Sequence, residues 1–115
     1  MNPALRQACD AEMAAATRLN EAGEFVQAFQ HLERAHVLGQ QYVLPHVATH
    51  YWMLRMGEKR RSVPEVVGQV IRIILGALGS AVGIVPTGNT GGTNISMFKR
   101  LPLDPDIQEL LKQYP

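Results

Sequence analysis

Apolar residues recur every three or four positions along most of the chain, which is the spacing of one buried helix face. Leu5, Cys9, Met13 and Ala16 show this spacing near the N-terminus. No segment shows the regular alternation of a half-buried strand, so the pattern predicts an all-α fold. Helices are expected over residues 3–20, 24–39, 43–58, 64–85 and 105–113.

Turn-forming residues divide these segments and indicate how they connect. The stretch PTGNTGGTN, which begins at Pro86, cannot continue a helix and predicts a Gly-rich loop over residues 86–103. Asp104 is a suitable N-cap, with Pro105 at the first position of a short helix. We expect one domain, residues 1–115, built as a compact antiparallel bundle of four main helices, the loop and the short C-terminal helix.

The apolar segment 64–85 is long enough to raise the question of a membrane span. It contains Arg72 near its middle, and Glu65 and Gln69 near its start, which are costly inside a bilayer. Small residues between positions 76 and 83 permit close packing of this helix against a neighbour. We therefore favour a buried central helix over a transmembrane one.

Composition and charge narrow the classes of function. The chain has 46% hydrophobic and 18% charged residues, as is typical of a globular protein. Its formal net charge of +1 gives no reason to expect nucleic acid as a partner. Cys9 is the single cysteine, so the chain has neither a disulfide framework nor a CxxC metal site. The N-terminal residues lack the order of a secretory signal, and we expect a cytoplasmic location.

All four histidines fall within twenty consecutive residues, and their spacing suggests a metal site. Imidazole is the commonest metal ligand. The patterns Glu33-x-x-His36 and His46-x-x-x-His50 each stack two side chains on one face of a helix. His31 lies at the edge of the apolar stripe of its helix.

Short connections bring further candidate ligands to the same height. Antiparallel packing of residues 24–39 against 43–58 places His36 level with His46. Packing of residues 3–20 against 24–39 then adds side chains of the first helix. The set at one level is Glu12, Glu33, His36, His46 and His50, with Cys9 nearby.

Mixed imidazole and carboxylate ligands suit a transition metal such as zinc, iron or copper better than calcium or magnesium. The candidate metal ligands are His36, His46, His50, Glu33 and Glu12, with His31 and Cys9 as weaker candidates. One Glu-x-x-His pair falls short of the set that a di-iron bundle requires, so we expect a single ion. The competing interpretation is that the histidines are hydrogen-bonded core residues. We predict no catalytic residue and no organic cofactor.

Several segments carry a resemblance to known families. The segment HLERAH at residues 31–36, His46 and His50, and the loop PTGNTGG at residues 86–92 resemble a small bacterial family of unknown function whose short members are helical. The resemblance implies a role in metal handling, because genes of that family often lie near metal-resistance genes. It implies no activity. Residues 3–39 also resemble one tetratricopeptide-repeat hairpin, although no second copy follows and a stable solenoid needs about three.

The sequence supports three hypotheses on function. The first is a transition-metal-binding protein that sequesters or delivers an ion. The second is a protein–protein interaction module, either a homodimer through the apolar face of residues 64–85 or a tetratricopeptide-like adaptor. The third is a small non-haem metalloenzyme. We favour the first, with a non-enzymatic role.

Overall fold

The computed structural model describes residues 1–93 and 95–114, and the regular structure of these residues is entirely helical. The predicted all-α bundle is confirmed. Asn94, in the expected loop, and Pro115, at the end of the expected domain, lie outside the described residues. The helices are α1 (Pro3–Glu21), α2 (Phe25–Gly39), α3 (Val43–Lys59), α4 (Val63–Val82) and α5 (Pro105–Gln113).

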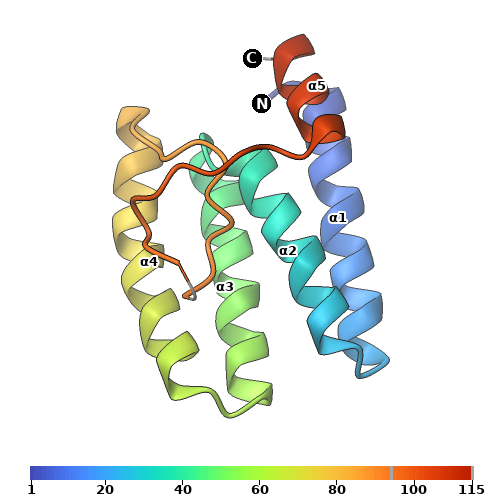
Figure 1. Ribbon diagram of the computed structural model, residues 1–115, viewed down its shortest axis with the longest axis vertical. Helices are drawn as coiled ribbons and strands as arrows, with labels where there is room; N and C mark the ends of the chain where they lie inside the picture. Colours follow the sequence, from blue (N-terminus) through green and yellow to red (C-terminus); the bar gives the residue numbers. More distant parts are fainter. Residues whose placement is uncertain (94, 115) are drawn as a thin grey trace.

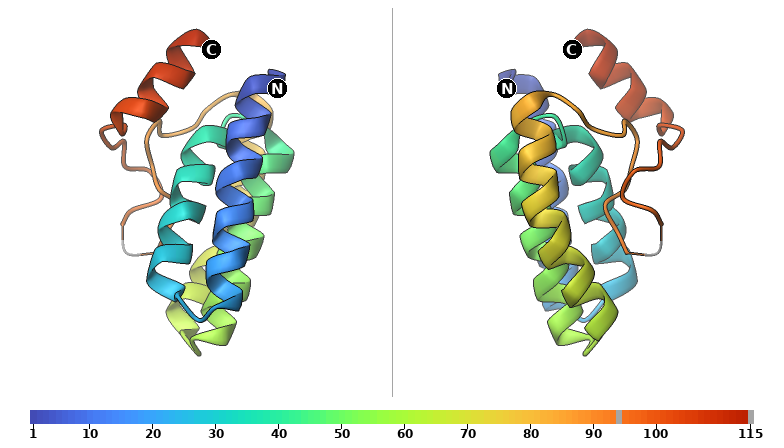
Figure 2. Two further views of the ribbon diagram at one scale, coloured as in Figure 1. Left: turned by 90° about the vertical axis from the view of Figure 1, so that its right-hand side faces the viewer. Right: turned by 90° about the vertical axis from the view of Figure 1, so that its left-hand side faces the viewer.

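Helices α1 to α4 run alternately up and down (Figure 1). Neighbours along the chain pack against each other, most extensively α1 with α2 and α3 with α4, and α1 also reaches α3. The short α5 packs against α2 and lies close to the N-terminal end of α1 (Figure 2). Because the main partner of α4 is α3, α4 stands at one edge of the array.

Two apolar clusters hold the other helices together. One joins α1, α2 and α5, and its buried members are Leu5, Cys9, Ala35, Val37, Leu38 and Ile107. The other joins α1, α2 and α3, and its buried members are Ala16, Ala28, Leu32, Met53 and Met56. No described residue of α4 belongs to either cluster. Helix α4 is therefore not held in place by either of these apolar clusters.

Helix α4 has its polar side inward and its apolar side outward. Its buried residues are Glu65, Gln69 and Ser80. The exposed apolar residues of the helix are Val63, Val67, Val70, Ile71, Ile74, Leu75, Leu78 and Val82. The prediction of a buried central helix is therefore wrong, because the inward face of α4 packs against polar groups rather than against the apolar core. Within the described residues, α4 is the one helix whose length and mean hydropathy of 1.6 would permit a membrane span.

The C-terminal end of α4 is set by a glycine. Gly83 has a φ of 76°, in the left-handed region, and ends the helix at Val82, short of the expected end at residue 85. The N–H of Ile84 then donates to the carbonyl oxygen of Gly79 at 2.8 Å. A Cβ on Gly79 would lie 2.7 Å from the carbonyl oxygen of Ile84, so this reversal also needs glycine there.

The segment from Gly83 to Asp104 leads from α4 to α5 and lies along one side of the array (Figures 1 and 2). Its carbonyl groups bind side chains of α4. The carbonyl oxygen of Gly91 accepts from Gln69 Nε2, and that of Ile95 accepts from Arg72 Nη2, both at 2.9 Å. The segment is thus attached to the polar face of α4.

Candidate metal centre

Three of the four histidines meet in the interior. His36 projects from the last turn of α2, and His46 and His50 project from successive turns of α3. Each is at most 5% exposed, and the ring centroids lie 4.6–4.9 Å apart. One nitrogen from each ring lies within 4.8 Å of the other two. The structure therefore brings together the three imidazoles that the sequence singles out.

Hydrogen bonds assign the tautomers of two of these rings. His36 Nδ1 lies 2.7 Å from the backbone carbonyl oxygen of Asn89, which can only accept, so this nitrogen carries the ring proton. His46 Nδ1 lies 2.5 Å from the hydroxyl oxygen of Ser80. That hydroxyl donates its own proton to the backbone carbonyl of Gln40 at 2.5 Å. Ser80 therefore accepts from His46, whose Nδ1 is also protonated.

The side chain of Gln69 assigns the third tautomer. Its Nε2 donates to Glu65 Oε1 at 2.8 Å and to the backbone carbonyl oxygen of Gly91 at 2.9 Å. The amide oxygen therefore faces His50 and accepts from His50 Nδ1 at 2.5 Å. All three neutral imidazoles thus carry their proton on Nδ1 and leave Nε2 with a free lone pair.

The separation of the His36 and His50 lone pairs is compatible with a bound metal ion. His36 Nε2 and His50 Nε2 lie 3.0 Å apart, and neither has a proton to share. A metal ion with bonds of about 2.0–2.1 Å would separate tetrahedral nitrogen ligands by about 3.3 Å, which small side-chain movements can supply. Histidines that bind a metal usually donate their other ring N–H to a protein acceptor, as His36, His46 and His50 do here.

Burial keeps the rings in the form that binds metal. It lowers the pKa of His36 well below 6.5, and the neighbouring His50 and His46 lower it further. Burial also lowers the pKa values of His46 and His50 to about 4. Neutral imidazole is the form that binds metals, so at neutral pH the three rings have the protonation state that a metal site requires.

The Gly-rich loop forms one wall of the site. Asn89 is 2% exposed, and its side chain donates to the carbonyl groups of Ser96 and Lys99 and accepts from the N–H of Gly91. Gly91 has a φ of +85°, and a Cβ there would lie 2.7 Å from Cδ2 of His36. Both the backbone conformation and the contact with the ring therefore require glycine.

The inward face of α4 forms a second wall. A Cβ on Gly76 would lie 3.0 Å from Cε1 of His46, so this glycine leaves room for the ring. About three turns closer to the start of α4, the carboxylate of Glu65 accepts from Gln69 and from the hydroxyl of Thr93. The buried polar face of α4 is thus occupied by groups that contact the histidines or their hydrogen-bond partners.

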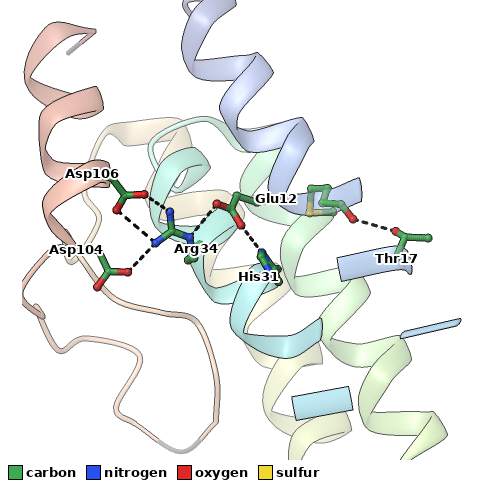
Figure 3. Close-up of polar contacts among 7 residues, drawn as sticks. Glu12, Thr17, His31, Arg34, Asp104 and Asp106 are labelled. Atoms are coloured by element: carbon green, nitrogen blue, oxygen red, sulfur yellow. Dashed lines mark hydrogen bonds and ion pairs between the residues drawn. The ribbon is translucent and has the colours of Figure 1, made fainter. Parts of the chain in front are cut away.

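Glu12 and His31 lie in a different cluster. His31 Nδ1 is 2.6 Å from Glu12 Oε2, and Arg34 Nε donates to Glu12 Oε1 at 2.8 Å (Figure 3). Arg34 also binds Asp104 and Asp106 at the start of α5. The expectation that Glu12 points toward the three imidazoles is corrected. Helix α1 is rotated so that Glu12 contacts Arg34 and His31 instead.

Glu33 and Cys9 also lie outside the group of three. Burial raises the pKa of Glu33, while a hydrogen bond from Thr90 in the Gly-rich loop lowers it. Cys9 packs in the apolar cluster with α2 and α5, and its thiol lies 3.6 Å from the carbonyl oxygen of Ala35. Burial raises the pKa of this thiol to about 11, so the thiolate that binds metals is disfavoured.

The three imidazoles border a cavity of about 600 Å³. Most of its lining comes from the C-terminal half of α4 and the segment that follows, with apolar side chains such as Leu75, Val82 and Phe98. Arg72, Arg100 and Gln40 supply polar side chains. Among the described residues, no aspartate or glutamate lines this cavity. A metal ion at the histidines would therefore be accessible from a mainly apolar pocket.

Sequence reasoning missed the groups that orient the imidazoles. One signal was available, because the polar and small residues of α4 recur at helical spacing within an apolar segment. These residues are Glu65, Gln69, Arg72, Gly76 and Ser80, and they share one face of the helix. Asn89 had no comparable signal, since loop spacing does not indicate which carbonyl group meets a distant ring.

A family model described as "Protein of unknown function (DUF3703)" matches residues 3–111 of the chain. The chain belongs to this family. The resemblance to a small family of unknown function is thus confirmed. No curated protein and no solved structure matches the DUF3703 chain. Its site must therefore be interpreted from its own geometry.

Proposed function

We propose that the protein is a cytoplasmic metal-binding protein that holds one transition-metal ion on Nε2 of His36, His46 and His50 and sequesters or delivers it. The main support is the orientation of the rings. Each Nδ1–H is engaged by an acceptor, which leaves a lone pair on each Nε2, and one nitrogen of each ring lies within 4.8 Å of the other two. Core histidines would normally satisfy both ring nitrogens with hydrogen bonds.

The chemistry of the donors selects the class of metal. Three neutral nitrogen ligands suit zinc, iron or copper and are poor ligands for calcium or magnesium, which require oxygen. Glu65 lies two hydrogen bonds from the ion position, through Gln69 and His50, where its charge would offset part of the charge of the metal. A single ion is proposed because the three rings form one compact group.

Elemental analysis and metal titration test this proposal. Protein purified without chelator, or reconstituted anaerobically, is expected to hold about one ion of zinc, iron or copper per chain. The double variant His46→Ala, His50→Ala is expected to lose more than about a hundredfold in zinc affinity, which exceeds the usual cost of losing an outer hydrogen bond. His31→Ala is the matched control, because His31 lies outside the group.

Two results would contradict the proposal. One is a zinc affinity that stays unchanged in the double variant, since the three rings would then not be the ligands. The other is failure of the wild-type chain to bind any transition metal after anaerobic reconstitution. Circular dichroism of each variant must show that the helices remain, so that a loss of affinity reports on the site.

A second candidate function rests on the outer face of α4. Val67, Val70, Ile71 and Ile74 belong to an apolar stripe along this helix, and each is at least 45% exposed. Contiguous exposed apolar surface usually marks an interaction site. We propose that a second copy of the chain covers it. Sedimentation of the wild type is expected to show a dimer and Ile74→Glu a monomer, whereas a monomeric wild type would contradict this.

A further inference from the structure

Two polar side chains that line the cavity beside the histidines have buried atoms without hydrogen-bond partners. Gln40 is 2% exposed, and neither its amide oxygen nor its amide nitrogen has a partner among the described residues. Arg72 Nε is also buried and has no hydrogen-bond partner among the described residues. Unsatisfied buried polar groups are uncommon in folded proteins, and at a cavity wall they indicate a ligand that satisfies them.

The charges around the cavity favour an anionic ligand. Arg72 is held in place by the hydrogen bond from its Nη2 to the carbonyl oxygen of Ile95. The three imidazoles are neutral ligands, so they add no negative charge to a divalent ion bound to them. With no acidic side chain among the described lining residues, the metal ion and Arg72 would give this end of the cavity a positive potential.

The open coordination position of the metal ion and the shape of the cavity indicate what kind of anion would bind. Three protein ligands leave at least one position open on a tetrahedral ion. The rest of the cavity is lined mainly by apolar side chains of α4 and of the segment after it, including Leu75, Leu78 and Val82. A volume of about 600 Å³ would accommodate a small organic molecule, whereas an inorganic anion would leave the apolar walls without contact.

We infer that the cavity binds a small organic monocarboxylate. Its carboxylate occupies the open metal position and accepts from Arg72, its apolar body packs against α4, and Gln40 meets a second polar atom where the ligand has one. The inference rests on the proposed function, because the metal ion supplies one of the two anchors. It goes further by naming a class of molecule that the site recognises.

Cobalt(II) and benzoate provide the test. Cobalt(II) takes the place of the native ion, and its visible absorption reports each change in its ligands. Adding benzoate to the cobalt-loaded wild-type chain is expected to change this absorption in a saturable way. Benzamide has the same shape without the charge and is expected to cause no change at the same concentration.

A variant tests the role of the guanidinium group. Arg72→Met retains much of the side-chain length and removes the charge. The variant is expected to bind cobalt(II) as the wild type does. Its affinity for benzoate is expected to fall at least about tenfold, because a hydrogen bond to a charged group is lost. Lys99→Met is the control, because Lys99 is an exposed cation outside the cavity lining. It is expected to leave the benzoate affinity unchanged.

The outcomes separate the two proposals. If cobalt(II) binds at the histidines but benzoate has no effect, or has the same effect in Arg72→Met, the carboxylate site is refuted and the metal site stands. An equal response to benzamide also refutes it, since charge would then play no part. If cobalt(II) does not bind, both proposals fail.

Discussion

The Nε2 atoms of His36 and His50 lie 3.0 Å apart, although the hydrogen bonds at their Nδ1 atoms leave neither Nε2 with a proton. Two lone pairs at this distance repel each other unless a cation lies between or beside them. Burial disfavours an added proton, since it lowers the pKa of both rings. A metal ion bound to both nitrogens, as we propose, would remove this repulsion.

Removing the amide of Gln69 is expected to weaken metal binding without removing a ligand. In Gln69→Leu, His50 loses the acceptor that holds its ring and its tautomer. We expect zinc affinity to fall about 10- to 100-fold. Competition with a chromogenic chelator measures this fall. Gln108→Leu on the exposed face of α5 is the control, and equal affinities in the two variants would argue against an orienting role for Gln69.

Replacing Gly91 is expected to damage both stability and metal binding. In Gly91→Ala the new Cβ would lie 2.7 Å from the ring of His36 and the residue would be held at a φ of +85°. Gly23→Ala is a matched control, because its φ of +79° imposes the same backbone cost of about 1 kcal/mol while its Cβ meets nothing within 4 Å.

Urea unfolding and zinc titration distinguish the two glycine variants. Gly23→Ala is expected to lose only the backbone cost and to retain its zinc affinity. Gly91→Ala is expected to lose about 1–3 kcal/mol more, which is the usual cost of overpacking, and to bind zinc more weakly. Equal behaviour of both variants would mean that the loop does not support the ring of His36.

Acid is expected to destabilise the metal-free protein through the buried rings. Burial lowers the pKa values of His46 and His50 from 6.5 to about 4, so between these values the unfolded chain binds more protons than the folded chain. The free energy of unfolding is therefore highest above pH 6.5 and falls as the pH decreases toward 4. The slope is up to about 1.4 kcal/mol per pH unit for each histidine.

Urea unfolding of the metal-free chain at a series of pH values measures this slope. The double variant His46→Gln, His50→Gln lacks the two groups and is expected to show a smaller slope over the same range. If wild type and variant have parallel profiles, the two rings do not titrate as burial predicts.

Arg34 is expected to hold α5 in place without contributing to the metal centre. Its guanidinium joins Glu12 of α1 to Asp104 and Asp106 at the start of α5 (Figure 3). In Arg34→Met we expect a loss of about 1 kcal/mol, because the ion pairs are partly exposed, and faster proteolysis just before α5. Zinc affinity should not change. A clear loss of zinc affinity would show that this cluster is coupled to the histidines.

Much of the fold and part of the site could be predicted from local spacing. The 3.6-residue period identifies the helices, and it places His46 and His50 on one face because they are four residues apart. The short connection between α2 and α3 then makes antiparallel packing, and the meeting of His36 with His46, a consequence of chain geometry. These relationships depend on residues close together in the sequence.

The remainder of the site was decided by tertiary packing. A period indicates which residues share a face, but it does not determine how far one helix is rotated against another, so Glu12 meets Arg34 rather than His36. The partners of the three Nδ1 atoms come from α4 and the Gly-rich loop, up to 53 residues away in the chain. Because polar groups of α4 face these rings, its apolar side faces outward, and only the folded arrangement reveals that inversion.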